Sequence, residues 1–187
     1  MSVVFISCNQ EVKNTVNFVH DNETTPTMIT YNDTTLISDS GIIRYKVIAK
    51  TWEVYDKSKD PHWYFPHRFY FEQLDTAFSV ILTLKADTVW NYTLRKLWKF
   101  KGNVFIRNKK DETFSGEELY WDQRQQKIYS NLPVVVSRPD QMILRGTGFE
   151  ANQQMTNYKF MNVGEMASGK TLFYVNEDAE GNEEKQE

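Results

Sequence analysis

The stretch Leu97-Trp-Lys-Phe-Lys-Gly-Asn-Val-Phe-Ile-Arg107 decides the fold class. Its even positions carry apolar or small residues and its odd positions carry mainly polar ones, with Leu97 and Phe105 as exceptions. This period of two predicts a half-buried β-strand with one dry face. The chain is also rich in residues that pack well on pleated sheets, with 12 Phe, 10 Tyr and 5 Trp. No stretch has an equally clear helical period, although 28–37 and 73–82 are ambiguous. The sequence therefore predicts an all-β protein.

This strand belongs to a repeated unit. Ala86, Gly116 and Gly146 begin similar segments that start 30 residues apart, and Ala49 begins an earlier copy with a longer spacing. Apolar side chains occupy even positions before each small residue and odd positions just after it. Such a switch requires one extra residue, which a β-bulge or a strand corner supplies. Units that bury one face by stacking on their neighbours predict a single twisted β-jelly roll, or open sandwich, of repeated antiparallel strands.

Composition divides the chain into four parts. Residues 1–8 form a short apolar run that ends in Ser7-Cys8, which looks like a lipoprotein signal remnant in which Cys8 is lipidated. The alternative is a buried N-terminal strand with an idle thiol. Residues 9–30 are polar and fit a linker, 31–175 form the folded unit, and 176–187 form a disordered acidic tail.

Charge and cysteine content exclude some classes of protein. The net charge is −3 and no basic run occurs, so the sequence gives no indication of a nucleic-acid partner. A single cysteine cannot form an intramolecular disulfide, which fits the cytosol and equally an exported bacterial protein. No window of about 18 apolar residues predicts a transmembrane helix.

Short segments between about 36 and 160 follow the order found in a known family. They are Asp39-Ser40-Gly41, Tyr45–Ala49, Trp52–Tyr55, Trp63–Pro66, Phe69–Phe71, Leu84–Asp87, Lys101–Val104, Glu117–Asp122, Ile128–Asn131, Pro133-Val134 and Gly146–Phe149. No single segment is specific, but the ordered series resembles the LptC family of periplasmic lipopolysaccharide-transport proteins. One departure is the anchor, because many members carry an N-terminal transmembrane helix, whereas residues 1–8 offer at best a lipidation site at Cys8.

The resemblance implies a twisted β-jelly roll (an OstA-like fold) in the periplasm, anchored to the inner membrane. It implies no enzymatic activity and no cofactor. The expected partners are lipopolysaccharide, the subunits of an inner-membrane ABC transporter that deliver it, and a periplasmic β-jelly-roll bridge protein that receives it by edge-to-edge strand contact.

The even-phase side chains are the candidate lipid-binding interior, because acyl chains in transit must be kept out of water. The candidates are Leu82, Leu84, Trp98, Phe100, Val104, Ile106, Phe114, Ile128, Val134, Val136, Leu144, Phe149, Tyr158 and Phe160. Alternation alone favours an ordinary dry sandwich core, and only the resemblance favours a lipid lining. Gly146 is expected at a late corner, where a side chain would block the close approach of another backbone.

Three other patterns are weaker. Residues 164–171 match a phosphate-binding loop, but no buried parallel strand precedes them and no helix follows. His62 and His67 lack the further ligands of a metal site, so no metal is expected. Glu117 and Glu118 are adjacent on a strand and fit solvated surface charges better than a catalytic pair.

Three rival functions stay open at this stage. The first is the soluble bridge protein of the same pathway, which would carry no membrane anchor. The second is a structural or glycan-binding envelope lipoprotein, which would need an exposed aromatic platform in place of an enclosed lining. The third is a nucleotide-binding enzyme, which would use Lys170.

Overall fold

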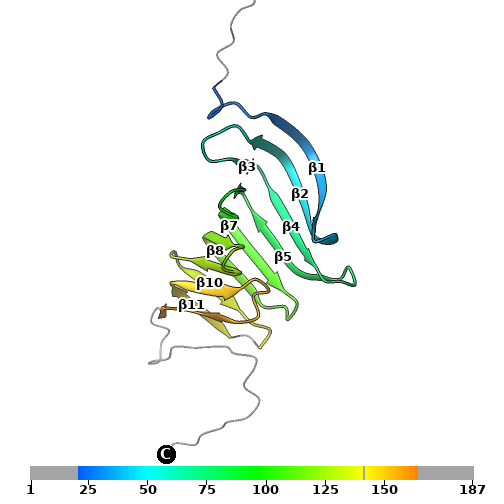
Figure 1. Cartoon of the computed structure of the whole chain (residues 1–187). Coiled ribbons are helices and arrows are strands. Elements are labelled where there is room, and N and C mark those ends of the chain that lie inside the picture. The colour runs from blue at the N-terminus through cyan, green and yellow to red at the C-terminus, as the bar shows by residue number, and fades with distance from the viewer. Residues whose placement is uncertain (1–20, 141, 164–187) are drawn as a thin grey trace, which may run out of the picture.

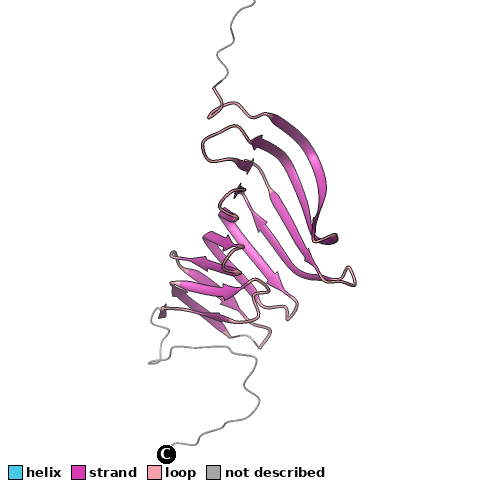
Figure 2. Cartoon of the chain, viewed as in Figure 1, coloured by secondary structure: helices cyan, strands magenta, loops and turns pink. Residues whose placement is uncertain are grey.

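The computed structural model describes residues 21–140 and 142–163, and these residues form strands without any helix (Figure 2). None of them therefore lies in a helix that could cross a membrane. The all-β prediction is confirmed. The strands are β1 (Met28–Asp39), β2 (Ile42–Tyr55), β3 (His62–Phe65), β4 (Phe69–Leu74), β5 (Val80–Ala86), β6 (Thr88–Tyr92), β7 (Leu97–Asn108), β8 (Thr113–Asp122), β9 (Lys127–Ser130), β10 (Val134–Ser137), β11 (Ile143–Thr147), β12 (Phe149–Asn152), β13 (Tyr158–Lys159) and β14 (Asn162–Val163).

Long strands are shared between two antiparallel sheets. In β7, residues 105–108 pair with β5 and residues 97–101 pair with β6. In β2, residues 45–49 pair with β4 and residues 53–55 pair with β3. β8 pairs in the same way with β10 and β9. One sheet therefore contains β4, β5, β10 and β11, and the other contains β3, β6, β9 and β12. This arrangement agrees with the predicted jelly roll or open sandwich.

The strands stack along the long axis of the molecule (Figure 1). β1 forms one end and pairs only with β2 among the described strands. The short strands β13 and β14 form the other end, where they pair with β12 and β11 respectively. We refer to these as the N-terminal end and the C-terminal end.

The corners lie where the change of parity predicts them. The register between β7 and β8 shifts between Lys101 and Val104, where Gly102 has a φ of 77°. At the same level Asp87 separates β5 from β6, and Gly148, with a φ of 66°, separates β11 from β12. The extra residue in β7 explains why apolar positions in β8 are even up to Phe114 and odd from Leu119 onward.

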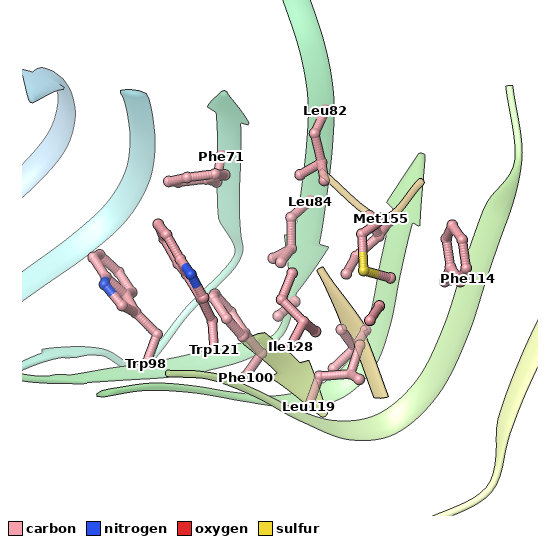
Figure 3. Close-up of a cluster of buried hydrophobic side chains, with 14 of the residues drawn as sticks. Phe71, Leu82, Leu84, Trp98, Phe100, Phe114, Leu119, Trp121, Ile128 and Met155 are labelled. Carbon is pink, nitrogen blue, oxygen red and sulfur yellow. The ribbon is translucent and has the colours of Figure 1, made fainter. Parts of the chain in front are cut away.

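A continuous hydrophobic core fills the space between the sheets (Figure 3). It extends from Val47 in β2 to Phe160 after β13, and Ile106, Phe114 and Val134 have no exposed surface. Burying a large apolar side chain stabilises the fold by about 1.5–3 kcal/mol. The core is therefore the main source of stability in a chain without an intramolecular disulfide.

Some boundaries differ from the expected ones. β1 begins at Met28, inside the stretch 9–30 for which we expected a linker, and the ambiguous residues 28–37 are strand. An edge strand that pairs along its whole length needs only moderate apolar content, so Thr and Asn in β1 resemble linker composition. Cys8, the tail 176–187 and the phosphate-loop pattern 164–171 lie outside the described residues.

Candidate lipid-binding interior

All fourteen candidate interior residues are buried, and all belong to the same core cluster. Side chains from the two sheets face each other across it. The ring of Trp121 in β8 lies 5.9 Å from that of Phe71 in β4 and 5.5 Å from that of Tyr45 in β2, measured between centroids. Burial agrees with the predicted interior face, while contact with lipid stays a prediction.

Sequence reasoning missed several members of this core. Phe71, Leu119, Trp121 and Met155 are all buried there (Figure 3). Leu119 and Trp121 follow the parity switch and could have been found by continuing the odd phase along β8. Met155 lies in the turn after β12 with a φ of 56°, and no strand periodicity predicts it.

The interior is almost completely filled. The space bordered by Phe71, Leu82, Ile106, Trp121 and Ile128 amounts to about 10 Å³. A void of that size holds one water molecule at most. In this conformation the side chains form the dry core that alternation alone favours. An acyl chain could enter only if the two sheets moved apart.

The C-terminal end of the interior is closed by buried polar groups. We call Asn108, Glu112, Arg138 and Tyr158 the polar bridge. Glu112 is 5% exposed and accepts hydrogen bonds from Asn108 Nδ2 (2.8 Å) and the Tyr158 hydroxyl (3.3 Å). Arg138 Nε lies 3.5 Å from the Glu112 carboxylate. Asn108 Nδ2 also donates to the carbonyl oxygen of Met155 (2.8 Å). The bridge therefore ties the β7–β8 turn of one sheet to the β12–β13 turn of the other.

Burial and the neighbouring charge act on the tyrosine of the bridge. Burial of the Tyr158 hydroxyl, followed by the negative charge of Glu112, raises the pKa of Tyr158 above its ordinary value. The phenol therefore stays protonated and keeps donating its hydrogen bond throughout the physiological pH range.

The N-terminal end has no equivalent closure among the described residues. There the core ends in the partly buried side chains of Ile37, Tyr45, Trp52 and Trp63. The rings of Trp52 and Trp63 meet edge-to-face at 5.0 Å. The apolar lining thus reaches the surface at this end.

The edge strand at this end exposes several apolar side chains. No other described strand pairs with the outer edge of β1. Its side chains Met28, Ile29, Tyr31 and Leu36 are 46%, 45%, 67% and 55% exposed. Long exposed edges of this kind usually cause aggregation, so a native partner strand offers a reason for one.

Three indole groups in the interior lack hydrogen-bond acceptors. Nε1 of Trp52, Trp98 and Trp121 is buried and has no partner within the described part of the chain. An unsatisfied buried donor costs about 1–3 kcal/mol. Such indole N–H groups can donate hydrogen bonds to the carbonyl oxygens of a bound molecule.

Gly146 lies where another backbone approaches closely. A Cβ at this position would lie 2.6 Å from the carbonyl oxygen of Asn162 and 2.7 Å from Cδ1 of Phe160. Gly146 pairs with Val134 in β10 and with Val163 in β14. The corner itself is two residues later, at Gly148. The close approach expected at Gly146 is therefore present.

Among the weaker sequence patterns, those that lie in the described residues are the two histidines and the Glu117–Glu118 pair. No group of three or more potential metal ligands occurs in residues 21–140 and 142–163. His62 Nδ1 lies 2.8 Å from the carbonyl oxygen of Asp60, and the His62 ring stacks on Tyr55. Glu118 forms an ion pair with Lys99 on the outer face, and Glu117 is exposed.

Comparison with known proteins identifies the family. The family model described as "Lipopolysaccharide-assembly, LptC-related" matches residues 1–162, most of the chain. The chain belongs to the LptC family. A search of curated proteins found no match. Membership of the LptC family makes the chain a periplasmic envelope component of lipopolysaccharide transport.

Proposed function

We propose that this LptC-family protein holds the acyl chains of lipopolysaccharide between its two sheets. It would receive the lipid from the subunits of an inner-membrane ABC transporter and pass it to a periplasmic β-jelly-roll bridge protein. The observation that carries the proposal is the interior itself. It is a continuous apolar lining that is closed at the C-terminal end, reaches the surface at the N-terminal end, and contains indole donors without acceptors.

The proposal requires the interior to open. The existing void of about 10 Å³ is far smaller than an acyl chain, so the Phe71 side and the Trp121 side must separate. Separation breaks side-chain contacts between the sheets and leaves the backbone hydrogen bonds within each sheet intact. Acyl chains would then fill the space between the separated side chains, and the burial of each lipid methylene would stabilise the complex by about 0.8 kcal/mol. The ester and amide carbonyls of the lipid would accept hydrogen bonds from Trp98 and Trp121.

The two ends suit edge-to-edge transfer. β1 offers an edge that no other described strand pairs with and that exposes several apolar side chains, and β13 and β14 end the sheets at the other side. Strand addition at such edges would extend the apolar interior of one jelly roll into the next. Lipid could then move between proteins without crossing water.

Photocrosslinking in cells tests the lipid-binding interior. A photoreactive amino acid at Gln73 would face the void, while one at Thr83, in the neighbouring strand β5 of the same sheet, would point to the outer face. Gln73 is chosen because its replacement leaves the apolar packing intact. A lipopolysaccharide adduct at Gln73 and none at Thr83 is expected. A folded, exported protein without an adduct at Gln73 would overturn the proposal and favour a glycan-binding envelope lipoprotein.

Anchoring through Cys8 is a separate proposal. Lipidation of Cys8 would tether the domain to the inner membrane without a transmembrane helix. Metabolic labelling with an alkyne fatty acid should label the protein, and Cys8→Ser should remove the label and release the protein into the periplasmic fraction. An unlabelled, freely soluble wild-type protein would instead fit the soluble bridge protein of the pathway.

A further inference from the structure

The outer face carries a hollow at the level of the first strand corner. We call it the corner hollow, and its volume is about 750 Å³. It lies at the corner where β1 and β2 run past the start of β4 and the end of β5. Its exposed residues Lys50, Arg68 and Lys85 each adjoin a core residue in sequence, so their side chains point to the outer face. Its lining residues are Asn32, Ile48, Ala49, Lys50, Arg68, Phe69, Tyr70, Lys85, Ala86, Asp87 and Asn103.

Three unpaired cations gather in the corner hollow. Lys50, Arg68 and Lys85 are exposed, and none of them forms an ion pair with another described residue. Lys85 is positioned over the ring of Tyr70, with its Nζ 5.9 Å from the ring centroid. Other lysines on the outer face, such as Lys46, are paired with carboxylates. A local excess of positive charge in a chain of net charge −3 is not explained by the overall composition.

The carboxylate of the corner hollow is already engaged. The Asp87 side chain accepts a hydrogen bond from Asn103 Nδ2 at 2.7 Å, and the Asp87 N–H donates to the carbonyl oxygen of Gly102 at 2.9 Å. A Cβ at Gly102 would lie 2.8 Å from the Asp87 carboxylate, so this wall is tightly packed. Asp87 is therefore held as part of the corner, and its single negative charge offsets only one of the three cations, so the hollow keeps an excess of positive charge.

A second hollow provides an internal comparison. At the equivalent corner of the next unit, a hollow of about 700 Å³ is lined by residues that include Phe105, Glu117, Leu132 and Pro133. No lysine or arginine lines it. Because both corners leave a hollow of similar size, the shape follows from the repeat. Of these two corners, only the first carries the positive charge, so the repeated shape does not require it.

We propose that the corner hollow binds a phosphate group carried by a saccharide headgroup. A phosphate monoester carries a charge of −1.5 to −2 and several acceptor oxygens, which suits a group of Lys and Arg side chains better than one carboxylate does. Ile48, which is 37% exposed, offers an apolar surface to the face of a sugar ring. Attribution of that phosphate to the lipopolysaccharide saccharide rests on the proposed function, but the phosphate site does not.

A titration with glucose 1-phosphate tests the site, with glucose as the uncharged control. Amide NMR signals of residues 48–50, 68–70 and 85–87 should shift with glucose 1-phosphate and not with glucose. The double variant Lys50→Gln/Lys85→Gln should weaken the apparent affinity about tenfold, because two charge-assisted contacts are lost. The matched variant Lys57→Gln/Lys109→Gln removes the same charge elsewhere and should bind like wild type. Absence of shifts, or equal loss in both variants, would overturn the site.

A photoreactive residue at Ile48 tests where the phosphate comes from. A lipopolysaccharide adduct at Ile48 in cells, weakened by Lys50→Gln/Lys85→Gln, would support attribution to the transported lipid. A phospholipid adduct, or none, would overturn that attribution. The Gln73 probe keeps the outcomes separate. An adduct at Gln73 without one at Ile48 leaves the transport proposal intact and removes only this attribution.

Discussion

The two ends of the sandwich close their shared core in opposite ways. At the C-terminal end Glu112 is buried under hydrogen bonds from both sheets, so the sheets are tied together. At the N-terminal end the core ends in partly buried aromatic rings, and no described polar group ties one sheet to the other. One end therefore resists separation of the sheets and the other permits it. A uniformly apolar core can therefore stabilise the fold and still open to a ligand when the two sheets are hydrogen-bonded to each other at one end only.

Gly146→Arg should have the largest effect, because it destroys the fastened end. The side chain would meet the Asn162 carbonyl oxygen and the Phe160 ring and would place a charge near the core. Overpacking with a buried charge should destabilise the protein by more than about 4 kcal/mol. Chemical denaturation, or loss of accumulation in cells, measures it.

Gly41→Arg is the control for this prediction. Gly41 lies in the β1–β2 turn with a φ of 80°, and nothing lies within 4 Å of a Cβ there. The substitution should cost about 1–2 kcal/mol through backbone conformation alone. Normal lipopolysaccharide transport with Gly146→Arg would contradict the description of a tightly packed C-terminal end.

Glu112→Gln should open the fastened end without unfolding the core. The carboxylate loses its ion pair with Arg138 and weakens its bond with Tyr158, at a cost of about 2 kcal/mol. Hydrogen exchange should accelerate in β12 and β13 and stay unchanged in β2 and β4. Glu72→Gln is the matched control. Glu72 also meets a lysine and a tyrosine hydroxyl, but within one sheet. Equal acceleration in both variants would show that the polar bridge does not fasten the sheets.

Trp121→Phe tests whether an indole of the interior donates a hydrogen bond to the lipid. The change removes a buried donor without an acceptor, which offsets part of the lost packing, so stability should change by less than about 1 kcal/mol. Affinity for lipopolysaccharide should fall about three- to tenfold if the indole donates to the lipid. Trp90→Phe, on the outer face where Trp90 stacks on Tyr64, should leave affinity unchanged. Unchanged affinity with Trp121→Phe would exclude the indole as a lipid donor.

The smallest effect concerns the ion pair between Lys99 and Glu118, which lies on the outer face of the sandwich. Burial raises the pKa of Glu118, but hydrogen bonds from Lys99 and Tyr120 outweigh it and hold the pKa below its ordinary value. A lowered folded-state pKa means that this contribution is present above the unfolded pKa and is lost as the pH falls through the folded value. Glu118→Gln should therefore remove less than about 1 kcal/mol at pH 7 and a smaller amount at acidic pH. Equal destabilisation at both pH values would contradict the ion pair with Lys99 as its cause.

The fold was predictable wherever residues alternate along a strand. Trp98, Phe100 and Ile106 follow one parity and are all buried, and Ala86 and Gly146 lie within two residues of the corners at Asp87 and Gly148. The polar bridge was not predictable. Asn108 and Glu112 look like ordinary turn residues, and their meeting with Tyr158 depends on how two distant turns close over the core. The corner hollow was equally hidden, because Lys50 lies in β2, Arg68 directly precedes β4 and Lys85 lies in β5, and only sheet pairing brings these segments to one hollow.

The unequal ladders at the two ends have a mechanical consequence. β1 is joined to β2 at eleven paired positions, whereas β12 and β13 share two, as do β11 and β14. Because the strands run across the long axis, tension along that axis loads the hydrogen bonds of each ladder in parallel. The two-pair ladders carry the greatest force per bond and should yield first. If neighbouring proteins pull on the chain during transport, the β12–β13 and β11–β14 ladders would separate first, while the β1–β2 ladder would stay paired.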